Sequence, residues 1–114
     1  MIQYFHNRFA KAKSTVAIEV PLKSDLLDLF SFGNKSIKID VGVAHVHPHD
    51  QYNKSIGREI SKSKMKKLTY TLDSAEFMDE DTIHLFLSAT EQDPMILFRI
   101  HRNSEKVYLL SALQ

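Results

Sequence analysis

The sequence predicts an α+β fold, a single domain over residues 1–114 with a mainly antiparallel sheet of five or six strands. Three observations lead to this prediction. Apolar and polar residues alternate along several segments, which is the period of a half-buried strand. Short clusters of turn-forming residues separate the later segments. One stretch, at about 50–63, has helical periodicity instead and predicts one principal amphipathic helix. The chain length suits one hydrophobic core.

The first half of the chain is expected to contain two strands and a short helix. The first strand lies at about 14–21, where apolar residues occupy alternate positions: Val16, Ile18 and Val20. Ser24 as an N-cap, with Asp25 in the first turn, favours a short helix at about 24–30. The next strand ends near Pro48 and carries four apolar residues on one face: Ile37, Ile39, Val41 and Val43.

The second half is predicted to be an antiparallel meander. Strands are expected at 67–78, 82–90, 95–102 and 106–112. Three polar clusters would form the turns: Asp79-Glu80-Asp81, Gln92-Asp93-Pro94 and Asn103-Ser104-Glu105. The candidate core residues of this meander are Phe77, Ile83, Leu85, Leu87, Ile96, Phe98, Ile100, Val107 and Leu109.

The principal helix is predicted to present two different faces. At 100° per residue, an apolar stripe that would dock on the sheet is formed by Tyr52, Ile56 and Ile60. A row of cations lies on nearly the opposite side: Lys54, Arg58 and Lys62. Asp50 is expected to cap this helix. Gly57 lies beside the apolar stripe, and close packing on the sheet would explain it.

Charge is segregated along the sequence. Three further lysines follow the helix, Lys64, Lys66 and Lys67, so residues 52–72 hold six cations against one carboxylate. Residues 73–93 hold seven carboxylates and no Lys or Arg. The net charge is nevertheless +1, which is small for a protein that binds nucleic acid over most of its surface. A local cationic face is therefore expected, with nucleic acid or an acidic protein surface as its partner.

Three histidines at alternate positions, His45, His47 and His49, predict an alternative function. They occupy odd-numbered positions, as the apolar residues of the preceding strand do. If the strand continued, their side chains would lie on the same face at its end. Imidazoles two residues apart can chelate a divalent transition metal, with Asp50, His84 or His101 as a further ligand. Against this, Pro48 bends the chain, and a histidine at the end of a core face is commonly a packed residue.

Composition excludes several classes of protein. The chain has no cysteine, so disulfides, thiolate ligands and a cysteine nucleophile are excluded. No apolar run reaches the roughly 18–20 residues of a membrane-spanning helix. The segment 1–13 lacks the apolar core of a signal peptide, and we therefore expect a cytoplasmic protein without a membrane partner.

The segment from His47 to Ile60 has the pattern P-x-D-x-[FY]-x-K-x-[IL]-G-R-x-I. It resembles a segment of small uncharacterised proteins of tailed phages. The resemblance covers under a fifth of the chain and supplies no catalytic residue. It implies a phage accessory protein, acting by binding in the cytoplasm of the host.

These observations favour a non-enzymatic binding protein without a cofactor, for example a phage regulator or inhibitor. Its contact surface would be Lys54, Arg58, Lys62, Lys64, Lys66 and Lys67. The alternative is a small metal-dependent enzyme or metal-binding protein built on His45, His47 and His49. A subunit that forms a homo-oligomer through an exposed sheet edge is a third hypothesis.

Overall fold

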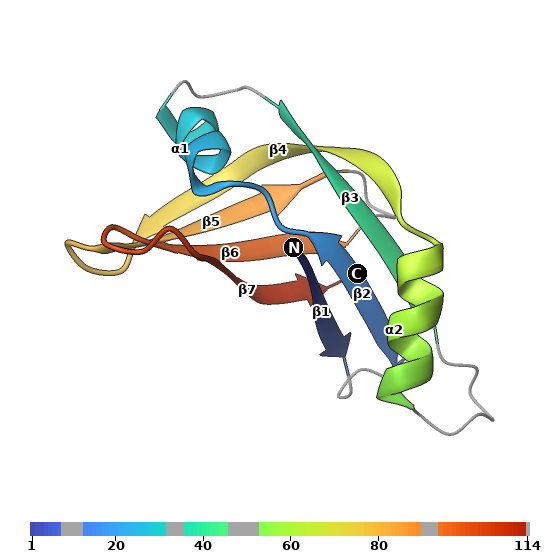
Figure 1. Cartoon of the computed structure of the whole chain (residues 1–114). Coiled ribbons are helices and arrows are strands. Elements are labelled where there is room, and N and C mark those ends of the chain that lie inside the picture. The colour runs from blue at the N-terminus through green and yellow to red at the C-terminus, as the bar shows by residue number, and fades with distance from the viewer. Residues whose placement is uncertain (8–12, 32–35, 46–52, 90–93, 114) are drawn as a thin grey trace.

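A computed structural model describes residues 1–7, 13–31, 36–45, 53–89 and 94–113 of the chain (Figure 1). Within these ranges seven strands form one antiparallel sheet, and each pairs with its neighbours in sequence order. The strands are β1 (Ile2–Asn7), β2 (Ser14–Glu19), β3 (Ser36–His45), β4 (Lys66–Phe77), β5 (Thr82–Ser88), β6 (Met95–His101) and β7 (Val107–Leu113). The helices are α1 (Lys23–Ser31) and α2 (Lys54–Ser63).

The predicted α+β fold with five or six strands is wrong. The protein is mostly sheet, with seven strands that curl into a nearly closed barrel. The strand that sequence reasoning missed is β1, which pairs with β2 from Ile2↔Glu19 to Asn7↔Ser14. All six residues of β1 are partly exposed, so it has no buried side to reveal an alternating pattern.

The two edges of the sheet, β1 and β7, approach each other and nearly close the barrel. Across this seam the Gln3 side-chain amide donates a hydrogen bond to the Val107 carbonyl, over 3.4 Å. At the end of β2, the Val20 N–H donates to the Met1 carbonyl over 3.1 Å. The Gln3 bond thus joins the two edge strands within the chain, which lowers the tendency of these edges to pair with another molecule.

Side chains from every second position fill the barrel, as is usual in small barrels. Tyr70 and Phe98 are the largest fully buried residues. Around them lie Val16, Ile18, Ile39, Val41, Leu85, Leu87, Ile96, Ile100, Val107 and Ala112. The predicted core residues of the meander are therefore largely confirmed. Phe77 is the exception, because it lies at the extreme end of β4 and is 66% exposed.

Helix α1 lies across one end of the barrel, where β3 begins and β4 ends (Figure 1). Leu26 and Leu29 are buried against the barrel core. The rings of Phe30 and Phe77 pack edge to face, with centroids 5.6 Å apart. The short helix predicted at about 24–30 is confirmed, and its role is to cover the barrel interior. Neither helix of the described ranges is long and apolar enough to cross a membrane.

Candidate functional site

Helix α2 begins at Lys54, later than the predicted start at about residue 50. Its N-cap is Asn53, whose side-chain oxygen accepts hydrogen bonds from the Ser55 and Ile56 N–H groups over 3.0 and 3.2 Å. These bonds satisfy two of the donors that a helix start leaves free. Asp50, the predicted cap, lies outside the described residues.

The helix rests on the outer face of β2 and β3 (Figure 1). Its contact residues are Gly57 and Ser61, the buried residues of α2. A Cβ atom added to Gly57 would overlap the Thr15 hydroxyl, and one added to Gly42 would overlap the Ser61 carbonyl oxygen. The helix and the sheet therefore meet almost backbone to backbone. The predicted close packing of Gly57 is confirmed.

The strands supply a platform of small side chains for this contact. On the outer face, Thr15 pairs with Ala44 and Ala17 pairs with Gly42, and all four are buried. The predicted apolar docking stripe is wrong, because Ile56 and Ile60 are 52% and 40% exposed. An isoleucine facing the sheet would hold the helix too far from this platform. Tyr52, the third predicted member, lies outside the described residues.

The cationic row, defined as Lys54, Arg58 and Lys62, is exposed along its whole length. Taking the midpoint between Gly57 and Ser61 as the docking direction, Arg58 lies roughly 80° round the helix on one flank. The two exposed isoleucines lie roughly 100° round on the other flank. The docking side of α2 thus lies between a cationic flank and an apolar flank. Because the helix is held on the barrel by this side, the orientation of both flanks is fixed.

The cationic row has no acidic partner in the part of the chain that is described. Two ion pairs are found there: the N-terminal ammonium with Glu19 at 2.6 Å, and Lys67 with Asp40 at 3.5 Å. Neither joins the basic segment 52–72 to the acidic segment 73–93. The positive charge of the row is therefore not neutralised by these groups.

The other predicted cations do not extend this row as one surface. Lys66 pairs with Val41 and Lys67 pairs with Asp40, so the two lysines point to opposite faces of the sheet. Lys67 is engaged with Asp40. Lys64 is the C-cap of α2 and is exposed. The six cations that are close together in the sequence therefore do not form one surface in the structure. The cationic row on α2 is the most regular group among them.

Of the predicted histidine ligands that the structure describes, His45 lies apart from His84 and His101, which line one groove. His45 is exposed at the last position of β3, opposite Ser14. His84 and His101 project from β5 and β6. Among the residues with described positions, no three of His, Asp or Glu come together to hold a metal ion. His47, His49 and Asp50 lie outside the described ranges, so the proposed metal site stays a prediction.

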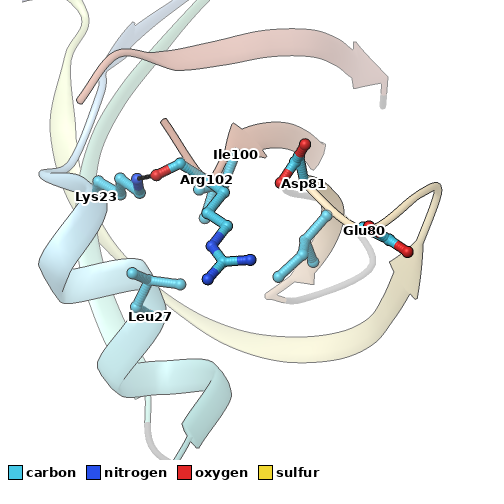
Figure 2. A pocket seen from close by; sticks show the side chains of 7 residues that line it. Lys23, Leu27, Glu80, Asp81, Ile100 and Arg102 are labelled. Atoms are coloured by element: carbon cyan, nitrogen blue, oxygen red, sulfur yellow. Dashed lines mark hydrogen bonds between the residues drawn. The ribbon is translucent and has the colours of Figure 1, made fainter. Parts of the chain in front are cut away.

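Two hollows offer further chemistry. One, of about 280 Å³, lies at the end covered by α1 and has an apolar wall of Leu27, Ile83 and Ile100 (Figure 2). The Lys23 ammonium crosses its edge and donates to the Arg102 carbonyl over 2.9 Å. Its lining also contains two cations, Lys23 and Arg102, and two acidic residues, Glu80 and Asp81. This balance gives the hollow no preference for one sign of charge.

The second hollow, of about 590 Å³, is a groove lined by residues from β5, β6 and β7 and from the turns that join β4 to β5 and β6 to β7. Sequence reasoning did not identify it as a site. The signal was present in the meander, where His84, Arg99 and Tyr108 occupy the positions between core residues. Such positions ordinarily face solvent, and the sequence does not reveal that they lie side by side on neighbouring strands.

The comparisons with protein-family models, with curated proteins and with solved structures find no match for this chain. The resemblance to tailed-phage proteins therefore stays a prediction.

Proposed function

We propose that this protein is a non-enzymatic binding protein that contacts nucleic acid through the cationic row of α2. The observation that carries the proposal is the row itself. Three exposed cations stand at a regular spacing on a helix that is seated tightly on the barrel, and they have no ion-pair partner among the described residues. Glu59 is the one carboxylate of the helix, and it lies beyond Lys62 on the side away from the sheet.

The spacing favours a regular polyanion over an irregular acidic protein surface. Residues four apart in a helix are separated by about 6 Å along its axis. Every second phosphate of one DNA strand recurs after about 6.8 Å of duplex. The whole row spans about 12 Å, enough to meet several phosphates of one backbone. Because the contacts go to phosphates, the binding is expected to depend on salt and not on base sequence.

The test is fluorescence anisotropy with labelled duplex DNA and with duplex RNA of the same length. The variant is Lys54→Glu, Arg58→Glu, Lys62→Glu. The matched control is Lys38→Glu, Arg102→Glu, Lys106→Glu, which makes the same change in net charge at exposed positions away from α2. We expect the α2 variant to bind at least about tenfold more weakly than the control, because it loses three phosphate contacts and repels the backbone.

If the α2 variant and the control variant lose affinity for the duplex equally, net charge explains the loss. That result would overturn the assignment of the contact to α2. If the wild-type protein binds neither duplex DNA nor duplex RNA at low salt, the proposal is overturned entirely. Binding of polyglutamate in preference to both nucleic acids would instead identify an acidic protein surface as the partner. Circular dichroism of each variant verifies that the barrel is retained.

A further inference from the structure

The groove on β5, β6 and β7 is built from a cross-strand row. Along the register, His84 pairs with Arg99 and Arg99 pairs with Tyr108, while Thr82 pairs with His101. The residues that flank these positions, such as Leu85 and Phe98, are fully buried in the barrel. Because side chains alternate along a strand, the row points outward and lines the groove.

The groove holds a positioned guanidinium. Arg99 lies over the Tyr108 ring, with its central carbon 5.0 Å from the ring centroid. The Lys106 ammonium lies at 5.0 Å from the same centroid. Contacts of this kind restrict where a cation rests while leaving its N–H donors available. Within the described ranges, neither cation forms an ion pair.

His101 adds a directed donor. Its Nδ1 accepts a hydrogen bond from the Asn103 N–H over 3.3 Å. In the neutral ring the hydrogen therefore resides on Nε2, which is free to donate to an oxyanion. His84 is the cross-strand neighbour of Arg99 and lines the same groove. Two imidazoles thus accompany the guanidinium.

The lining contains one carboxylate, Asp79, and its turn engages one of the two oxygens. Its Oδ1 accepts from the Asp81 N–H over 2.8 Å. That bond, with help from the Thr82 hydroxyl and N–H and from nearby His101, outweighs desolvation and lowers the pKa of Asp79 below 3.8. Glu76 pairs with His84 on β4 but is not among the lining residues. Donors therefore outnumber free acceptors in the groove.

We propose that this groove binds the phosphate group of a small phosphate monoester. The Arg99 guanidinium presents a planar fork that matches two phosphate oxygens, and His101 and His84 donate to the remaining ones. At about 590 Å³ the groove falls within the usual range for small-molecule sites, so an organic group fits beside the phosphate. Met78 and Tyr108 provide apolar surface for that group.

This site is separate from the cationic row, because α2 rests on β2 and β3 and none of its residues lines the groove. The two proposals can therefore fail independently. Reversing the charge of Lys54, Arg58 and Lys62 should leave phosphate binding unchanged, and changing Arg99 should leave duplex binding unchanged.

The experiment is an NMR titration that follows the ring protons of His84 and His101 at about pH 7.5, where a phosphate monoester carries close to two charges. The probes are adenosine 5′-monophosphate, glucose 6-phosphate and inorganic phosphate, with adenosine as the neutral control. We expect saturable shifts with the phosphates and none with adenosine. Tighter binding of one organic phosphate would indicate whether a nucleoside or a sugar fills the rest of the groove.

The variants are Arg99→Gln and Arg99→Lys, and the matched control is Arg102→Gln, a nearby cation that lines the other hollow. Arg99→Gln should weaken phosphate binding by about tenfold or more, and Arg99→Lys should recover part of the loss because it keeps the charge without the fork. Arg102→Gln should bind as the wild type does. The proposal is overturned if adenosine shifts the same signals, if no phosphate gives a saturable shift, or if Arg99→Gln binds as tightly as Arg102→Gln.

Discussion

Two glycines determine how closely α2 approaches the barrel. A Cβ at Gly42 would overlap a backbone atom, the Ser61 carbonyl oxygen. A Cβ at Gly57 would overlap the Thr15 hydroxyl, which also lies 3.0 Å from His6 Nδ1. The neighbour at Gly42 is main chain, which moves only with the whole helix. Gly42 and Gly57 thus fix the position of α2, the helix that carries the proposed binding residues.

Gly42→Ala is expected to destabilise the protein by about 1–3 kcal/mol, because the new methyl group forces α2 away from β3. Gly57→Ala should cost less, since alanine recovers about 1 kcal/mol of helix propensity. Urea unfolding followed by circular dichroism measures both. The control is Ser63→Ala, at an exposed position of the same helix. A Gly42→Ala protein as stable as this control would contradict the backbone contact.

Asp79 predicts a dependence of stability on pH. The Asp81 N–H holds the folded pKa of Asp79 below 3.8, the ordinary value. The unfolded chain therefore takes up a proton at a higher pH than the folded one does. The resulting stabilisation is complete above pH 3.8 and is lost as the pH falls through the lowered folded pKa.

Asp79→Asn removes this titration and keeps an oxygen that can accept from Asp81. We expect its urea midpoint to fall less than that of the wild type between about pH 6 and pH 3. The matched control is Asp73→Asn, an exposed carboxylate on β4. Parallel pH profiles for the wild type and Asp79→Asn would show that the turn gains nothing from the ionised carboxylate.

At the scale of elements, α2 shows what the sequence reveals and what it hides. Its periodicity, its cationic row and the tight packing of Gly57 were all predictable from residue spacing. The side of α2 that docks on the barrel was not predictable, because the spacing of Ile56 and Ile60 indicates an apolar stripe buried against the sheet. The outer face of β2 and β3 is instead lined with small residues that accept Gly57 and Ser61. That surface exists only after the strands have paired.

The cationic row predicts a measurable salt dependence. Three phosphate contacts on duplex DNA correspond to a slope of about −2.7 in log affinity against log salt concentration. Arg58→Gln should reduce the magnitude of this slope by about 0.9, since one contact is lost. Anisotropy titrations at four or more salt concentrations give the slope. Lys38→Gln, at an exposed position on β3, should leave it unchanged, and an equal effect of both changes would contradict a defined site.

At the scale of the whole molecule, closure of the sheet was the feature least accessible from the sequence. Six of the strands can be recognised from their alternating apolar and polar residues, but β1 is partly exposed throughout and has no buried side. Closure depends on the approach of β1 to β7, which are at opposite ends of the chain. Local patterns carry no information about such a contact. For the same reason the groove on β5, β6 and β7 was not predicted.

The barrel also keeps the two proposed sites apart. The cationic row stands over β2 and β3, and the groove lies on β5, β6 and β7, about three strands away around the barrel. The two sites therefore share no residue, and each can be tested by its own substitutions. Contact of nucleic acid with α2 should therefore perturb residues of α2 and not those of the groove.

The most direct test is an NMR titration of the ¹⁵N-labelled protein with duplex DNA that has 5′-hydroxyl ends. We expect the perturbed backbone amides to cluster on α2, over Lys54–Ser63, and the signals of the β5 and β6 amides to keep their positions. These shifts should also decrease as salt is added, because the contacts are electrostatic. Perturbations centred on β5 and β6, or unchanged perturbations in the Lys54→Glu, Arg58→Glu, Lys62→Glu variant, would contradict the proposed contact of nucleic acid with α2.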